Sequence, residues 1–450
     1  MGYKIQMIAP TSFFADTGCH VRILEEIRSL QEAGHEVVVC TYHTGDPVEN
    51  VDIRRSLDVP WLKRVQVGSS RHKLYFDAML TFKSAWVAFR FKPDIIHAHL
   101  HEGALIGFQL KWLLRLGKAP LIFDFQGSLT SEMQDHHFLN KNGPFYKPTL
   151  WLERLINRMA DKIITSSHNA TQVLKRDFKV PKDRVTTVGD RVNLEKFHPV
   201  RSEEDREEVA RLKETLGIPA DRKVVVYLGL LATYQGTDLL LEAASLLKKE
   251  MPEAFFVVMG YPGVDSYARK AEELGLRDRV IFPGRIPFKD APRYLRIGDV
   301  AITPKMSATE GAGKIPIYMA TGLPVVTFDT PVSREFLDDL GSYATYGSAR
   351  SLADRLKELL SDNAGRVELG RKIREKAEHD LGRHVTRREL EAVYREAFKR
   401  IGRGAPRTGT ELGVAADSGH DTQLDRDGIA NPFDLPEVAN GQTRPLPEQF

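Results

Sequence analysis

The chain alternates short β-branched runs with amphipathic helical stretches, and the alternation restarts after a break at residues 189–199. Between the first two runs, residues 19–35 carry apolar side chains three and four positions apart, which predicts a helix ending at Gly34. Such alternation predicts a parallel sheet with helices on both faces. The strands predicted in the first half are Lys4–Ala9, Glu36–Thr41, Asp94–Ala98, Pro120–Phe125, Lys162–Ser166 and Arg184–Val188.

A second series begins after a charged helical stretch at 202–217. Its predicted strands are Lys223–Gly229, Ala254–Gly260, Arg279–Gly284, Val300–Thr303, Pro324–Phe328 and Ser342–Tyr346. The fold class expected is therefore α/β, with two doubly wound Rossmann-like domains facing a cleft. Open sheets of this kind bind ligands at the carboxyl ends of their strands. We expect an N-terminal acceptor domain at 1–190, a donor domain at 191–383, a helix at 384–401 able to pack back on the first domain, and a disordered polar tail at 402–450.

Composition excludes several classes of protein. The formal net charge is only +3 over 450 residues, and the sequence has no dense run of basic residues. No nucleic-acid partner is therefore expected. The two cysteines, Cys19 and Cys40, lack metal-ligand spacing and fit a reducing compartment. The chain opens on a strand rather than a signal segment, and no apolar run reaches the roughly 18 residues of a membrane span. The sequence therefore predicts a cytoplasmic protein.

One loop in the second half combines charge with small residues. It lies between the strand ending at Thr303 and the strand beginning at Pro324, and it reads PKMSATEGAGKIPIYMATGL. Pro316 falls in the first turn of a short helix, and Gly322 falls where a left-handed cap is needed. Lysines and exposed backbone amides are the groups that bind phosphate. The loop is therefore either a plain strand-to-helix connection or a cradle for a phosphorylated ligand.

Several segments, in order, resemble a known family. They are TGCHVRILEEIRSLQEAGHEV, DIIHAH, VGDRVNLEKFHP, YLGLLATYQGTDLLLEAASLL, MGYPG and EGAGKIPIYMATGLPVV. Over roughly residues 3–400 the chain resembles GT-B-fold glycosyltransferases of retaining family 4. The resemblance implies transfer of a sugar from a nucleotide-sugar donor to a glycan, lipid-linked or small-molecule acceptor, with retention of configuration. It implies no metal and no cofactor, and a role in making cell-envelope polysaccharide.

The resemblance also assigns residues to the donor. Glu310 matches a glutamate that hydrogen-bonds the donor sugar, and we take it as catalytic. Glycines at matching positions allow the backbone to approach the phosphate or the base. The donor-binding residues expected are Gly18, Arg191, Tyr234, Gln235, Gly260, Arg285, Lys305, Gly311, Gly313, Lys314 and Tyr318.

The donor site departs from the family pattern in two places. A second glutamate, which grips the ribose in the family, falls on Tyr318 by one count and on Ile317 by another. An arginine and a lysine that face the diphosphate are replaced by Leu230 and Gln235. The charge of a departing diphosphate must then be met elsewhere. The candidate substitutes are Lys314, Lys305 and Arg191.

The first domain departs once more, because a histidine that often follows the fourth strand is Gln126 here. The segment HAHLHEG supplies histidines instead, at 97, 99 and 101, followed by Glu102. We expect no metal there, since the histidines would share a face only if the strand continued past its predicted end. Gln126 and His101 are the further catalytic candidates, His97 is expected to be structural, and the acceptor-binding candidates are His99, Glu102, Asp135 and His136.

The stretch from Trp61 to Phe91 allows two interpretations. A basic loop at 61–73 precedes a helical pattern at 74–91 that is apolar nearly all round and rich in aromatic residues. Such a helix is either buried against the sheet or in peripheral contact with a membrane, which would be the inner face in a cytoplasmic protein.

Three functions remain open on the sequence. Glu310 and the Gly-Ala-Gly-Lys loop favour a working glycosyltransferase with a reworked donor site. Leu230 and Gln235 favour a non-catalytic GT-B protein that binds or scaffolds. Another nucleotide-sugar enzyme, such as an epimerase, is the third interpretation.

Overall fold

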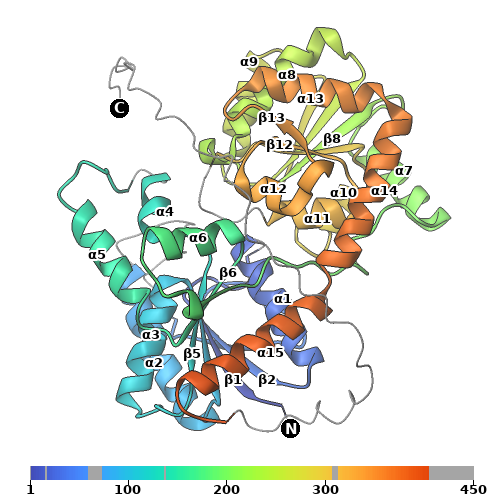
Figure 1. The fold of residues 1–450 in the computed structure, drawn as a ribbon. Helices are drawn as coiled ribbons and strands as arrows, with labels where there is room; N and C mark the ends of the chain where they lie inside the picture. The colour runs from blue at the N-terminus through green and yellow to red at the C-terminus, as the bar shows by residue number, and fades with distance from the viewer. Residues whose placement is uncertain (1, 16–17, 59–72, 136–137, 307–312, 405–450) are drawn as a thin grey trace, which may run out of the picture. The chain divides into compact units, whose positions relative to one another are not determined.

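A computed structural model describes residues 2–15, 18–58, 73–135, 138–306 and 313–404 of the chain (Figure 1). Two parallel sheets form its framework. The first has the order β3-β2-β1-β4-β5-β6-β7. Its strands are β1 (Lys4–Ala9), β2 (Glu36–Thr41), β3 (Asp52–Arg55), β4 (Ile95–His99), β5 (Leu121–Phe125), β6 (Lys162–Thr165) and β7 (Val185–Thr187).

The second sheet has the order β10-β9-β8-β11-β12-β13. Its strands are β8 (Lys223–Leu228), β9 (Ala254–Met259), β10 (Val280–Gly284), β11 (Val300–Thr303), β12 (Val325–Phe328) and β13 (Ser342–Ala344). All pairings in both sheets are parallel, so the predicted α/β class with two Rossmann-like domains is confirmed. One strand was not predicted. The edge strand β3 reads DIRR, and its half-exposed polar residues lack the apolar character that marked the others.

Helices cover both faces of the first sheet. One core joins the sheet to α2 (Lys73–Phe91), α3 (Leu100–Leu113), α5 (Tyr146–Ile156) and α6 (His168–Arg176). The other core joins it to α1 (Gly18–Glu32) and to α15 (Arg383–Arg400), the last helix described. Among the described residues this domain also contains α4 (Leu129–Asp135).

The second sheet is covered in the same way. One core includes α8 (Thr237–Glu250), α9 (Val264–Glu273) and α13 (Ala349–Ser361). The other includes α7 (Glu203–Thr215), α10 (Ala291–Leu295), α11 (Lys314–Ala320), α12 (Pro331–Leu337) and α14 (Asn363–Asp380). Short 3-10 turns occur at Lys182–Arg184, Thr233–Gln235 and Asp338–Leu340. None of the described helices combines the length and apolarity that crossing a membrane requires.

Local sequence explains where the charged helix α7 begins. The Ser202 hydroxyl accepts a hydrogen bond from the Asp205 amide at 3.1 Å, and the Asp205 carboxylate accepts one from the Ser202 amide at 3.3 Å. This reciprocal capping box satisfies two amides that a helix start leaves unpaired. The second domain's helices thus begin directly after the connector at 189–199.

Candidate active site

Lys314 lies at the carboxyl edge of the second sheet. It is the first residue of α11, and its ammonium donates to the Gln235 side-chain oxygen at 2.9 Å and to the Tyr227 hydroxyl at 3.2 Å. The same nitrogen is 4.4 Å from the centre of the Tyr227 ring, a cation–π distance. A lysine from α11 and a glutamine from the turn before α8 are therefore in direct contact beside the end of β8.

Three glycines allow the loops at this edge of the sheet to pack closely against one another. A Cβ on Gly229 would lie 2.6 Å from the Lys314 nitrogen, and one on Gly260 would lie 1.9 Å from the Gly229 carbonyl oxygen. Gly236 has φ +76°, and a Cβ there would come within 1.8 Å of the Pro304 carbonyl oxygen. Only glycine allows these backbone segments to approach so closely.

Tyr318 is a correction to the sequence analysis. Its side chain is buried in α11, and its hydroxyl accepts a hydrogen bond from the Leu228 amide at 2.8 Å. Burial also raises the pKa of this phenol above its ordinary value. The hydroxyl therefore ties α11 to β8, and the expected contact with a ribose was wrong for this conformation of the chain.

Arg191 is a second correction. Its guanidinium pairs with Glu389 of α15 at 2.9 Å, and its side chain is only 11% exposed. Burial lowers the pKa of Arg191 although Glu389 opposes the change. The residue thus ties the connector to α15, which leaves Lys314 and Lys305 as the substitutes for the missing cations of the donor site.

The other donor candidates are placed as follows. Arg285 follows β10, with its guanidinium 5.5 Å from the centre of the Tyr261 ring. Lys305 follows β11, Tyr234 lies in the turn before α8, Gly313 precedes α11, and Gly18 opens α1. Their roles toward a donor stay predictions. Glu310, Gly311 and His136 lie outside the described residues, and of Asp135 only the place at the end of α4 is described.

A buried ionic network lies in the first domain. Asp124 of β5 is fully buried and accepts hydrogen bonds from Arg22 at 2.8 Å and from His99 at 2.9 Å. Burial alone would raise the pKa of Asp124, but Arg22 and His99 hold it well below its usual range. Arg22 also donates to Asp190 at 3.0 Å, so the network joins α1, β5 and the connector.

Gln126 extends this network toward solvent. It follows β5, is partly exposed, and donates its amide nitrogen to Asp124 at 2.8 Å. The bond leaves the Gln126 amide oxygen as the group able to accept from, or lie against, a reacting centre. Its predicted catalytic role is not tested by this geometry.

The histidines are more buried than the sequence suggested. His99 has no exposed surface and donates its Nδ1–H to Asp124, so the direct acceptor contact expected of it was wrong. His101 is 4% exposed, lies against the rings of Phe123 and Phe125, and is 3.5 Å from Glu153. Its side chain is packed in the core beneath α3, and this burial contradicts its assignment as catalytic. His97, which was expected to be structural, has no exposed surface.

One cluster among the described residues has metal-ligand chemistry. Potential ligand atoms of Glu26, His97 and His99 lie within 4.8 Å of one another. However, the Arg22 guanidinium is 3.2 Å from the Glu26 carboxylate, where a second cation would be repelled. The two imidazole rings are also stacked at 19°, so they cannot both direct a lone pair at one ion without rotating. We interpret the cluster as a polar core, and metal-independence stays a prediction.

A second polar cluster lies where β2 and β4 end. Lys73 pairs with Glu102 at 2.5 Å, and the Tyr42 hydroxyl donates to Asp77 at 2.6 Å. Glu102 is partly exposed, as its predicted contact with an acceptor requires. Burial raises the pKa of Asp77 to about 6. Tyr42, Lys73 and Asp77 escaped the sequence analysis because nothing in their spacing shows that α2 begins beside Glu102.

Asp77 gives a prediction with a defined sign. Because its folded pKa lies above the ordinary value of 3.8, the folded protein binds the extra proton, and stability should fall as pH rises from about 4 to about 6. Asp77→Asn keeps an acceptor for Tyr42 and should remove that fall. Melting temperatures of both proteins at pH 4.5 and pH 7 measure it. Asp329→Asn is a control that should keep the wild-type change between these two pH values, because the hydrogen bond from Arg334 lowers the pKa of Asp329 and its effect on stability falls below about pH 4. Equal pH dependence in wild type and Asp77→Asn would contradict the assignment.

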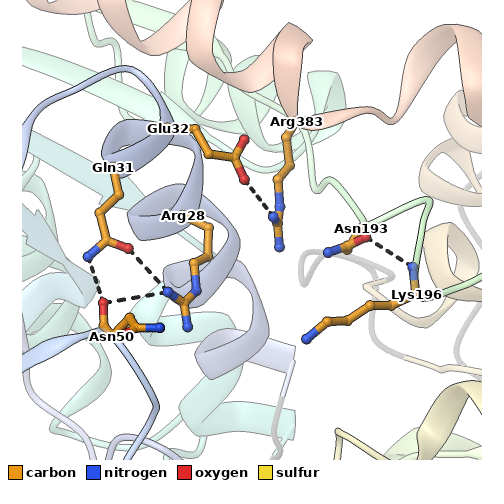
Figure 2. A pocket seen from close by; sticks show the side chains of 7 residues that line it. All are labelled: Arg28, Gln31, Glu32, Asn50, Asn193, Lys196 and Arg383. Atoms are coloured by element: carbon orange, nitrogen blue, oxygen red, sulfur yellow. Dashed lines mark hydrogen bonds and ion pairs between the residues drawn. The ribbon is translucent and has the colours of Figure 1, made fainter.

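A polar pocket of about 470 Å³ lies elsewhere, beside α1 and the start of α15 (Figure 2). Two of its cations, Arg28 and Arg383, have partners within it. Arg28 donates to Gln31 and to the Asn50 carbonyl oxygen, and Arg383 pairs with Glu32 at 2.7 Å. None of the predicted donor or acceptor residues lines it. We therefore do not assign the donor to this pocket.

Two doubly wound parallel sheets, each with polar side chains at the carboxyl ends of its strands, define the GT-B class of protein. Two family models match the chain: Glycosyltransferase Family 4 over residues 17–196, and Glycosyl transferases group 1 over residues 208–380. The chain therefore belongs to the family 4-like glycosyl transferases of group 1, and it is a glycosyltransferase.

Individual relatives are distant but extend over most of the chain. Alpha-monoglucosyldiacylglycerol synthase of Streptococcus pneumoniae is 24% identical over 409 residues, which cover 88% of each protein. Among solved structures, sucrose-phosphate synthase of Thermosynechococcus elongatus matches with a TM-score of 0.73 at 20% identity, over 88% of this chain and 99% of that one. The HepE protein of Anabaena, solved with UDP-glucose, matches at 0.66 and 18% identity, over 87% and 99%.

Proposed function

We propose that the protein transfers a hexose from a nucleotide-sugar donor to a lipid-linked or other glycan acceptor, with retention of configuration and without a metal or cofactor. The observation that carries the proposal is the position of Lys314 beside Gln235 and Gly229 at the end of β8. Breaking the sugar–diphosphate bond leaves negative charge on the diphosphate. A fixed cation at that point stabilises the charge without reorganising when the bond breaks.

The lysine makes up for a residue that the chain has lost. Gln235 stands where the family has a lysine toward the diphosphate, and a neutral amide cannot supply that charge. Lys314 brings its ammonium to the Gln235 oxygen from a different element, α11. Lys314 thus places a cation next to Gln235, the position of the lysine that the chain has lost. This supports a donor site that is altered but still working.

On the acceptor side, we propose that Gln126 lies near the anomeric carbon of the donor sugar, with its amide oxygen directed at that carbon. Asp124 holds the amide nitrogen, and Arg22 keeps Asp124 charged. Glu102, paired with Lys73, would contact the acceptor. Glu310 would hold the donor sugar by analogy with the family. We place the protein in the cytoplasm, in peripheral contact with the inner face of the membrane where a lipid-linked acceptor resides. Cell-envelope polysaccharide or glycolipid synthesis would then be its context.

A thermal-shift panel of UDP-, GDP-, ADP- and dTDP-sugars tests the donor site on wild type and on Glu310→Ala. A donor present at 100 times its dissociation constant should stabilise the protein by about 2.7 kcal/mol, which is readily seen as a higher melting temperature. We expect one nucleotide class to raise the melting temperature of the wild type, and a smaller shift in Glu310→Ala. No shift with any donor at high concentration would favour a non-catalytic GT-B protein instead.

A further inference from the structure

Exposed apolar side chains gather on one part of the molecule. Of eighteen large apolar residues exposed among those described, thirteen belong to α2, α3, α5 or the chain just before α5. The three helices cover the same face of the first sheet, with α3 in contact with both α2 and α5 (Figure 1). We refer to their outward surface as the three-helix face. A concentration of this size on one surface indicates an interaction site.

The apolar residues follow the helical repeat. On α2, Phe82, Trp86 and Phe89 are spaced four and three positions apart and are 70%, 48% and 72% exposed. Their stripe lies opposite the residues of α2 that pack on the sheet, such as Leu80 and Val87, which are buried. The helix therefore has two apolar faces. The buried-helix interpretation explains only one of them.

The neighbouring helices contribute in the same way. Trp112 of α3 is 76% exposed and Trp151 of α5 is 65% exposed, and each has an exposed leucine beside it. Three of the chain's four tryptophans, Trp86, Trp112 and Trp151, thus lie exposed on this surface. Tryptophan is the residue most typical of the boundary between lipid tails and head groups.

The charged residues of the three-helix face indicate a membrane rather than a protein as its partner. Within residues 73–92, 100–118 and 138–158, none of the three carboxylates is exposed, whereas eight basic side chains are: Arg90, Lys92, Arg115, Lys118, Lys141, Lys147, Arg154 and Arg158. Two cations also lie over the exposed Trp86 ring, Lys83 at 5.0 Å and Arg90 at 5.1 Å. Glu132 of the adjoining helix α4 is an exposed carboxylate, so the surface is basic in balance. Aromatic residues with a basic balance are complementary to an anionic lipid surface.

We propose that the three-helix face binds the surface of an anionic phospholipid bilayer, and that the acceptor is a membrane lipid with a hydroxyl in its head group. The acceptor assignment rests on the proposed function; the membrane surface does not. Helix α2 connects the two, because its first residue, Lys73, pairs with Glu102 at the carboxyl edge of the sheet. The exposed residues Leu74 and Tyr75 come next, so the polar cluster at the edge continues directly into the apolar surface.

Vesicle binding by the full-length protein tests the proposal without any sugar donor. A Trp61→Phe background leaves only Trp86, Trp112 and Trp151 to fluoresce. We expect their emission to shift to shorter wavelength, and the protein to sediment, with vesicles of phosphatidylcholine and phosphatidylglycerol. We expect little of either with phosphatidylcholine alone or at high salt. Adding Trp112→Ser and Trp151→Ser should weaken binding about tenfold.

Val367→Ser provides a matched control, because Val367 is 66% exposed on α14 of the other domain and should bind like the wild type. No binding to anionic vesicles at low salt would overturn the proposal, as would equal binding by the tryptophan variant and the control. A dimer in solution that Trp112→Ser dissociates, without vesicle binding, would make the face an interface between copies and would also overturn it. A donor-induced thermal shift is independent of vesicles, so failure of the donor site is recognised separately.

Discussion

Replacing Lys314 with alanine is expected to weaken binding of the nucleotide-sugar donor by about 10- to 100-fold, because a hydrogen bond to a charged group contributes roughly 1.5–3 kcal/mol. The effect should be large because the chain has Leu230 and Gln235 where its family has cations, so no arginine or lysine at those positions can take over. The loss should appear in both donor affinity and turnover, since the same ammonium would meet the charge of the departing diphosphate. Isothermal calorimetry and initial rates measure the two quantities.

Lys249→Ala is the matched control. Lys249 is an exposed lysine at the end of α8, so its removal changes the net charge equally without touching the end of β8. Lys314→Arg should keep part of the affinity, because the charge stays while its geometry changes. Unchanged donor binding in Lys314→Ala would remove the main support for a reworked donor site and would favour a non-catalytic protein.

The sequence indicated Lys314 as a donor-binding candidate because its evidence is local, and that role stays a prediction. A strand, a glycine-containing loop and a short helix follow one another within about two dozen residues, and parallel sheets bind ligands where such loops leave the strand. The same local logic placed nearly every strand, since valine and isoleucine runs are readable without knowing their neighbours. It failed at β3, where an edge position allows the polar sequence DIRR.

What the sequence could not provide were contacts between distant residues. Arg191 could not be distinguished from a phosphate-binding arginine until α15 placed Glu389 beside it. Tyr318 was likewise indistinguishable from a ribose contact until its hydroxyl was found on the Leu228 amide. A signal for the buried network was present but not used: Arg22 and Glu26 are charged residues on the buried side of α1, and Asp124 interrupts the apolar strand LIFDF. Charges in such positions are retained only when paired.

Replacing Asp124 with alanine is expected to destabilise the first domain by about 3–5 kcal/mol, because it leaves the Arg22 guanidinium buried without its main partner. Arg22 makes three hydrogen bonds to that carboxylate and is itself only 6% exposed. Since Asp124 has a folded pKa below its unfolded value, its contribution is complete above the unfolded pKa and is lost as pH falls through the folded pKa. The free energies of unfolding of wild type and variant should therefore differ most at neutral pH and less in acid. Unfolding in guanidinium chloride at several pH values measures this difference.

The double variant Arg22→Met, Asp124→Leu separates charge pairing from packing. Replacing both partners by apolar residues removes the unpaired Arg22 charge. It also leaves Glu26 and Asp190 without their cation, so the double variant should recover only part of the stability lost in Asp124→Ala. Gln126→Ala leaves Arg22 and Asp124 paired, so it should unfold like the wild type while lowering the rate of sugar transfer. A double variant that recovers no stability relative to Asp124→Ala would contradict the idea that the unpaired Arg22 charge causes the loss. A Gln126→Ala enzyme with normal turnover would remove Gln126 from the reaction and leave Asp124 with a structural role alone.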